Sequence, residues 1–516
     1  FAPARRKHLT RVHPQPPVRL SRIAAVFFIL FLAILACTRG PVDGEGGAHV
    51  TPFGALPLTP TPTIFFPTDS PTLTPTAIKA FTPLPPLVPG ENLLYRVQAG
   101  DTLDLLAQRF NVPLEELLKL NNLSTGESLV VDELILIPAR LDQTGPDFKI
   151  IPDSELVYSV GVAGFDVEEF VQAQGGYLAR HREFARGAMR TGAEIVKRVA
   201  LDHSVSPRIL LAILEYRSGW VTNTAEPEDK TDPIYPNPRR QGLFNQLDWL
   251  ADTLNPGYYS WRDGTLTALD FPEGAQVRIH PTLNPGTVAV QYMMSRIYSE
   301  PEWETAVGPT GLYATYASLF GEPFEKAIDP LIPDGLAQPE LRLPFDDTWL
   351  FISGPHSAWE PGSPWAALDF APPSESGGCL PSDQWVLSPA AGLVVRSGDG
   401  VVVIDLDGDG REQSGWAIFL LHIAAEGRVP VGTNVESGDP IGHPSCEGGR
   451  STGTHVHVAR KFNGEWIPAD GPVPFDLGGW VAHFGPREYK GTMTKGDDSI
   501  TACECSADVS GISPSR

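Results

Sequence analysis

The chain has 516 residues and a formal net charge of −23, from 62 acidic and 39 basic residues. This length is long for a single hydrophobic core and predicts about three domains at roughly 150 residues each. Lys/Arg-rich runs are confined to the extreme N-terminus, which argues against a nucleic-acid-binding protein, since such proteins carry a basic face. No nucleic-acid partner is therefore expected.

Residues 1–37 are typical of an export signal. A basic stretch precedes an unbroken apolar run at 23–36, shorter than the roughly 20 residues that span a membrane. The run ends in Leu35-Ala36-Cys37, which resembles the lipobox of bacterial lipoproteins. This resemblance implies that Cys37 carries lipid and becomes the new N-terminus. The alternative is an uncleaved signal anchor. Either way, we expect an extracytoplasmic location at the cell surface or envelope.

Residues 38–91 form a Thr/Pro-rich linker. Stretches such as Thr59-Pro60-Thr61-Pro62-Thr63 can form neither a helix nor a central strand. They favour extended polyproline II, a semi-rigid tether of roughly 3 Å per residue. Such a tether after a lipid anchor would let the protein reach into the cell wall.

Residues 92–138 have the pattern of a small βααβ unit. Tyr95 and Val97 alternate as in a strand, and Leu103, Leu106 and Phe110 then recur at helical spacing. A second helix follows Pro113, and strand alternation returns at 134–138. This order of elements, strand, helix, helix, strand, is expected to enclose its own small core.

The same segment resembles a LysM module. The resemblance is carried by Tyr95-Arg96-Val97-Gln98-Ala99-Gly100-Asp101-Thr102-Leu103, by Asn121 and by Leu136-Ile137-Pro138. It implies binding of N-acetylglucosamine-containing glycans, and hence of peptidoglycan, in a groove near Gly100, Asp101, Thr102 and Asn121. One departure is Asp132-Glu133, where the family usually has Gly-Gln. The alternative is a degenerate module that serves as a spacer.

Residues 150–342 are predicted to be mainly helical. Ser206-Pro207 is a helix start, and the apolar helix that follows ends near Gly219. The stretch 211–220 resembles the catalytic helix of lysozyme-like lytic transglycosylases, although Arg217 stands where the family has its acid. Glu215, two residues earlier, could supply a raised-pKa carboxyl for glycan cleavage. The alternative is a structural glutamate at a helix end.

Residues 343–496 change to short strands and glycine turns, the pattern of an antiparallel all-β domain. Two apolar runs, 393–396 and 401–405, flank Ser397-Gly398-Asp399-Gly400 as in a hairpin. The fold class expected for the whole chain is therefore multidomain α+β, with residues 497–516 as a C-terminal tail.

Several motifs in this β region resemble the M23 family of zinc metallopeptidases. They are the glycine-rich turn 448–453 before Thr454-His455-Val456-His457, Leu420-Leu421-His422-Ile423, and Ala366-Ala367-Leu368-Asp369-Phe370. The resemblance spans about residues 345–470. It implies one zinc ion held by protein ligands, with an open position for water. It further implies that His455 and His422 are the catalytic histidines that do not bind the metal.

One departure concerns the first metal ligand. Most of the family has a histidine four residues before the aspartate, where this chain has Trp365. His356 lies thirteen residues before Asp369, a longer spacing that is similar to that of the staphylolysin-like branch of M23. The resemblance therefore assigns zinc to His356, Asp369 and His457. His443 and His483 match no motif and are expected outside the site.

An acidic run and four cysteines are further features of the C-terminal region. The run Asp405-Leu406-Asp407-Gly408-Asp409-Gly410 resembles the start of a calcium loop, but Trp416 stands where the bidentate Glu belongs. A solvated hairpin tip is the prediction, and Ca²⁺ is the alternative. Cys379 and Cys446 are expected to pair, with Cys503 and Cys505 as alternative partners.

The resulting prediction is an exported zinc endopeptidase that cuts peptide cross-links of peptidoglycan, held at the wall by a LysM module. Two alternatives remain at this stage. One is a non-catalytic wall scaffold or amidase activator, and the other is a bifunctional hydrolase whose middle domain cuts glycan.

Overall fold

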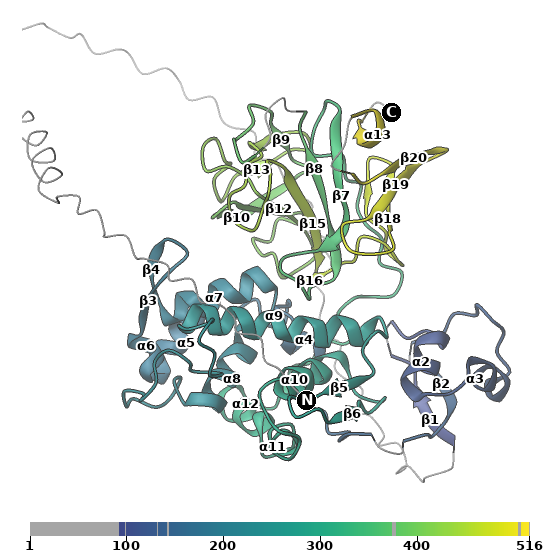
Figure 1. The fold of residues 1–516 in the computed structure, drawn as a ribbon, viewed down its shortest axis with the longest axis vertical. Helices are drawn as coiled ribbons and strands as arrows, with labels where there is room; N and C mark the ends of the chain where they lie inside the picture. Colours follow the sequence, from purple (N-terminus) through teal and green to yellow (C-terminus); the bar gives the residue numbers. More distant parts are fainter. Residues whose placement is uncertain are drawn as a thin grey trace, which may run out of the picture. The chain divides into compact units, whose positions relative to one another are not determined.

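The computed structural model describes residues 92–98, 100–131, 133–141, 144–373, 378–503 and 507–514. The expected signal segment, Cys37 and the linker lie outside the described residues. All described residues belong to the unit Leu73–Arg516, which combines helices with antiparallel sheets (Figure 1). Within these ranges, no helix is both long enough and apolar enough to cross a bilayer.

The N-terminal unit has the βααβ order that the sequence predicts. Its elements are β1 (Asn92–Arg96), α2 (Leu103–Phe110), α3 (Leu114–Asn121) and β2 (Leu134–Pro138). The strands pair antiparallel, and Thr102 caps α2 by accepting a hydrogen bond from the Leu105 amide. Phe110, Leu117 and Ile137 are completely buried between the strands and helices. The apolar spacing in the sequence thus corresponds to one small core.

The middle region is mainly helical, as expected, with two short hairpins. Its elements are α4 (Asp153–Leu156), α5 (Val167–Gln174), α6 (Tyr177–Arg180), β3 (Arg182–Ala185), β4 (Ala188–Thr191), α7 (Gly192–His203), α8 (Pro207–Ser218), α9 (Leu243–Arg262), β5 (Ala268–Asp270), β6 (Gln276–Arg278), α10 (Pro285–Ser295), α11 (Glu300–Ala306), α12 (Leu312–Phe320) and the 3-10 helix η1 (Pro323–Lys326). Helix α8 starts with Pro207 and ends at Gly219, whose φ of 68° is in the left-handed region. The Ser206 side chain makes no capping bond, so the proline alone marks the start of this helix.

The C-terminal region is all-β apart from one short helix. Its elements are β7 (Trp349–Ser357), β8 (Trp365–Ala371), β9 (Val386–Leu387), β10 (Gly392–Gly398), β11 (Val401–Asp405), β12 (Trp416–Leu421), β13 (Asn434–Val435), β14 (Pro440–Gly442), β15 (Val456–Phe462), β16 (Glu465–Trp466), β17 (Asp476–Leu477), β18 (Trp480–Phe484), β19 (Gly491–Lys495), β20 (Asp498–Thr501), α13 (Ala507–Ser510) and β21 (Gly511–Ile512).

The main sheet of this region has nine strands in the order β13-β10-β11-β12-β15-β8-β7-β21, with β16 attached to β15. A second sheet, β17-β18-β19-β20, lies beside β7 (Figure 1). The segment 497–516, expected as a tail, therefore contributes to both sheets. Ile512 pairs with Trp349 at the sheet edge and is completely buried, which explains why this segment is ordered against the domain.

Both faces of the main sheet are buried. Leu420 and Val458 belong to the core on one face, whereas Phe419 and Ala459 belong to a second core on the other. A charged group is buried here as well: Glu412 lies 3.1 Å from the Lys461 ammonium and 3.0 Å from Nε of Arg396. Because a buried charge is costly unless it is paired, this network depends on all three side chains.

Candidate metal centre and catalytic cleft

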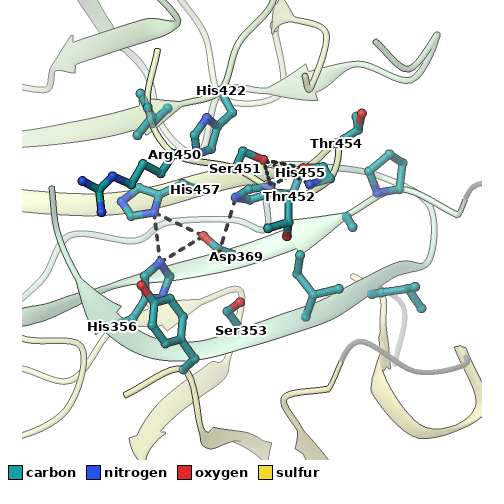
Figure 2. A pocket seen from close by; sticks show the side chains of 18 of the residues that line it. Ser353, His356, Asp369, His422, Arg450, Ser451, Thr452, Thr454, His455 and His457 are labelled. Carbon is teal, nitrogen blue, oxygen red and sulfur yellow. Dashed lines mark hydrogen bonds and ion pairs between the residues drawn. The ribbon is translucent and has the colours of Figure 1, made fainter. Parts of the chain in front are cut away.

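Strands β15, β8 and β7 are neighbours in the main sheet and form the floor of a cleft with a volume of about 700 Å³. The cleft is lined by all five predicted site residues of this domain, His356, Asp369, His422, His455 and His457. Figure 2 shows His356, Asp369 and His457 turned toward one another, with His422 and His455 beside them. The structure thus brings together residues that are up to 101 positions apart in the sequence.

Three potential ligand atoms converge in this cleft. Nε2 of His356 lies 3.0 Å from Nδ1 of His457, and each of these nitrogens lies 3.2 Å from Oδ1 of Asp369. All three side chains are buried. Among the described residues, this trio is one of two groups whose ligand atoms are close enough to hold one metal ion.

Backbone carbonyls fix the tautomers of the two histidines. The second ring nitrogen of His356, Nδ1, lies 2.9 Å from the Gly354 carbonyl, and Nε2 of His457 lies 2.9 Å from the Ala358 carbonyl. A carbonyl only accepts, so both nitrogens must donate. The opposite nitrogens then face each other and Asp369 with lone pairs. Oδ1 of Asp369 is buried without a hydrogen-bond donor. A cation between the three atoms would satisfy all of them.

The electrostatics of the three side chains also favours a cation between them. Burial opposes charge on His356, but the attraction of Asp369 outweighs it and raises the pKa of this histidine. Burial lowers the pKa of His457. Burial alone would raise the pKa of Asp369, yet the neighbouring His356 and His455 hold it well below its usual range. The ionised Asp369 therefore attracts positive charge to this point, and carboxylate and imidazole are both ligand types that bind zinc.

Strand register places Asp369 and His457 directly opposite each other in β8 and β15. His356 reaches them only because β7 is irregular. Ser353 pairs with Asp369 and His356 pairs with Ala367, so three steps along β7 match two along β8. In a regular strand, residues three apart point to opposite faces. The extra residue, at Gly354-Pro355, is a β-bulge that puts Ser353 and His356 on the same face (Figure 2).

The two remaining histidines sit on the adjacent side of the cleft. His455 is two residues before His457 and therefore shares its face; its Nε2 lies 3.7 Å from Oδ2 of Asp369. His422 follows β12 with a left-handed φ of 67°, an unusual conformation for this residue type. The rings of His422 and His455 are 4.5 Å apart. Nδ1 of each ring contacts a backbone carbonyl, that of Glu447 or Gly453, which leaves both Nε2 atoms as acceptors.

Burial, followed by the charges of His455 and His457, lowers the pKa of His422 to about 3. His422 therefore stays neutral across the pH range in which the protein would work. His455 occupies a different position, with its Nε2 beside the carboxylate of Asp369.

One wall of the cleft is cross-linked. Cys379 and Cys446 form a disulfide with a Cα–Cα distance of 5.4 Å, as predicted. It joins the segment that includes Gly378 and Leu380 to the loop that leads into the glycine-rich turn, and both segments line the cleft. Cys503, which the sequence offers as an alternative partner, is itself disulfide-bonded.

Sequence reasoning missed two residues beside the candidate ligands. The ring of Tyr489 stacks on His356 at a centroid distance of 4.7 Å and an interplanar angle of 24°, and it lines the cleft. The preceding Glu488 accepts hydrogen bonds from the backbone amide and hydroxyl of Ser357. Both lie on the connection between β18 and β19, and no motif in the sequence marks them. His443 and His483 lie outside the lining of the cleft, as expected.

The acidic run 405–410 forms the second candidate metal group. Ligand atoms of Asp405, Asp407 and Asp409 lie within 4.8 Å of one another. The two oxygens of Asp405, however, accept bonds from backbone amides of the same loop, at Asp407, Gly408 and Gly410. The loop is therefore held by its own hydrogen bonds, in keeping with the predicted hairpin tip.

Glu215 occupies a structural position in the middle region. It lies in the last turn of α8, and its carboxylate accepts bonds from the backbone amides of Val221 and Thr222 and from the Thr222 hydroxyl. A general acid must offer a proton to a leaving group. This carboxylate is instead committed to the turn that follows its own helix, which favours the structural alternative.

The predicted glycan-binding residues also have internal roles. The Asp101 carboxylate pairs with Arg109 at 2.9 Å and accepts bonds from the Tyr95 hydroxyl and the Gln98 amide. Asn121 bonds the backbone of Leu136 through both ends of its amide. Thr102 caps α2, and Gly100 has a φ of 86° in the turn before it. These residues shape the two loops that border the expected groove.

Family models match two of the regions described above, the N-terminal unit and the middle region. Residues 95–138 match the model of the LysM domain, and residues 149–332 match that of the LasA N-terminal domain. The middle region therefore matches this family rather than the lysozyme-like one that the sequence stretch 211–220 suggested. Two curated relatives are Protease LasA from two strains of Pseudomonas aeruginosa. The one from strain UCBPP-PA14 is 22% identical over 368 residues, which covers 67% of this chain and 79% of the relative.

The solved structures that resemble the chain include M23 peptidases. The M23 metalloprotease pseudoalterin from the deep sea is 22% identical, with coverage of 32% of this chain and 96% of that chain and a TM-score of 0.28. A zinc-containing peptidase from Vibrio cholerae is 22% identical, with coverage of 27% of this chain and 41% of that chain and a TM-score of 0.20. The alignment with LasA is longer than residues 149–332, so the homology extends beyond the middle region.

Proposed function

We propose that this chain is a zinc-dependent endopeptidase of the M23 type that cuts peptide cross-links of bacterial peptidoglycan. The observation that carries the proposal is the convergence of three lone-pair donors, from His356, Asp369 and His457, on one buried point at the floor of a cleft. Homology to LasA supports a peptidase, and the LysM match supports a wall substrate.

The three ligands would hold zinc on the floor of the cleft and leave its open side toward solvent. Bound zinc would polarise the scissile carbonyl and lower the pKa of a coordinated water. On that side, His455 presents Nε2 as a proton acceptor, and the nearby Asp369 carboxylate would stabilise the imidazolium that results. His422 stays neutral and orients polar groups of the substrate through its own Nε2.

We further propose that the LysM module and lipid on Cys37 hold the enzyme at the cell wall. The LysM match is the support for glycan binding, and the lipobox resemblance is the support for the anchor. Mass spectrometry of the protein isolated from membranes would test the lipid. Binding of residues 92–138 to chitin oligomers would test the module.

The central experiment combines metal analysis with mass spectrometry of peptidoglycan digests by the full chain. We expect about one zinc per chain and new peptide amino termini. The matched variant Asp369→Asn should lose both, whereas Glu215→Gln should lose neither. New sugar ends that disappear in Glu215→Gln would favour the bifunctional alternative. If the folded protein binds no zinc and does not digest peptidoglycan, the alternative of a non-catalytic wall scaffold or amidase activator would be favoured.

A further inference from the structure

The bulge in β7 that aims His356 into the site is held from outside the main sheet. A bulge removes local backbone groups from their ladder, and these must find other partners. Three such groups flank His356: the amide of Gly354, the carbonyl of Pro355 and the amide of Ser357. In a regular strand, part of this set would bond to β8.

All three groups are bound by two consecutive residues of the β18–β19 connection. The Gly354 amide donates to the Tyr489 carbonyl at 3.0 Å, and the Tyr489 amide donates to the Pro355 carbonyl at 3.2 Å. The Ser357 amide and hydroxyl donate to Oε1 of Glu488 at 2.9 and 2.6 Å. These three backbone groups of the bulge thus take their partners from the backbone of Tyr489 and the side chain of Glu488.

Close packing leaves this arrangement little freedom. A Cβ added to Gly354 would lie 2.6 Å from the backbone nitrogen of Gly491. Tyr489 has a φ of 68°, a conformation that a bulky residue adopts only where its surroundings impose it. Its ring covers His356. The conformation of the β18–β19 connection and that of the bulge therefore constrain each other through close packing.

The side chain of Glu488 is the part of this contact that a substitution can remove. Its carboxylate lies next in sequence to the strained Tyr489 and bonds to the residue next to His356. The Gly354 carbonyl that fixes the tautomer of His356 lies on the same bulge. We propose that Glu488 is a positioning residue for the metal site: by holding Ser357, it fixes the bulge that aims Nε2 of His356 at Asp369 and His457.

This inference rests on the proposed zinc site, and its test is a zinc-binding measurement on the full chain. Loss of groups that orient a metal ligand typically weakens metal affinity by roughly 10- to 100-fold. Glu488→Ala should weaken zinc binding by that factor in competition with a chelator. The zinc-free variant should unfold within a few degrees of the zinc-free wild type. Glu488→Gln keeps a carbonyl acceptor for Ser357 and should restore affinity to within a few-fold. Glu426→Ala, at an exposed glutamate outside the cleft, is the matched control and should bind as the wild type does.

The outcomes separate the two proposals. Wild-type zinc affinity in folded Glu488→Ala, with an active wild type, overturns the positioning role alone. A wild type that binds no zinc overturns the proposed function and this role with it. If Glu488→Ala does not fold, Ser357→Ala removes the hydroxyl donor and keeps the backbone. A several-fold loss of zinc affinity in that variant supports the role, and unchanged affinity overturns it.

Discussion

His356 is the proposed zinc ligand whose spacing from Asp369 departs from the common M23 pattern, and its removal tests the proposed metal site most directly. Nε2 of His356 is one of three converging donors, 3.0 Å from the nitrogen of His457 and 3.2 Å from the oxygen of Asp369. Four-ligand structural zinc sites bind with about 10–16 kcal/mol at pH 7, or roughly 2.5–4 kcal/mol per ligand. At about 1.4 kcal/mol per tenfold, His356→Ala should weaken zinc binding by roughly 10²- to 10³-fold.

Competition of the full chain with a chromophoric chelator measures this affinity. Peptide cleavage should fall in parallel at limiting zinc, while circular dichroism stays unchanged because the sheet has its own core. His443→Ala is the matched control, since this histidine lies outside the cleft lining and bonds to the Gln384 carbonyl. Wild-type zinc affinity in His356→Ala would refute the ligand assignment and make His422, which lines the same cleft, the next candidate for the third ligand.

Three further predictions concern stability. Glu412→Ala leaves Lys461 buried without a carboxylate partner, while Arg396 keeps Asp202, and breaking a buried pair in this way typically costs about 3–5 kcal/mol; an unchanged denaturation midpoint would contradict this. Cys446→Ser opens a loop of sequence separation 67, for which chain entropy predicts a loss of about 4 kcal/mol. Because reduction also opens the disulfide of Cys503, wild type and variant should unfold at the same denaturant concentration once both are reduced. Burial raises the pKa of Asp252 from 3.8 to about 6, so the folded protein binds more protons than the unfolded chain between these values, and stability falls as pH rises through this window. Asp252→Asn should therefore raise the melting temperature at pH 7 and not at pH 4, and equal effects at both pH values would count against the assignment.

Local patterns predicted much of the fold. In the N-terminal unit, the helical spacing of Leu103, Leu106 and Phe110 and the later strand alternation predicted the observed order of elements, because all four elements belong to one short segment and share one small core. The hairpin of β10 and β11 also followed from its turn. The segment after residue 497 was misjudged as a tail, since the pairing of Ile512 with β7 joins residues far apart in sequence.

In the middle region, residue type and local sequence alone suggested a catalytic role for Glu215 that its contacts do not favour. Glu215 stands at the end of an apolar helix and near aromatic residues, as a glycan-cleaving acid would. Nothing in the local sequence shows that its carboxylate is taken by the amides of Val221 and Thr222. That commitment depends on how the chain turns after α8.

For the site itself, the sequence alone determined which side chains could bind a metal. The motifs around Asp369, His422 and His455-Val456-His457 are local, and the chemistry of zinc limits ligands to a few residue types. Only the tertiary structure decided how these groups are aimed. The register of β8 and β15, the bulge that turns His356 and the hydrogen bonds from Glu488 and Tyr489 all join segments distant in sequence. A one-residue change in strand register moves a side chain to the opposite face, and no local pattern encodes that choice.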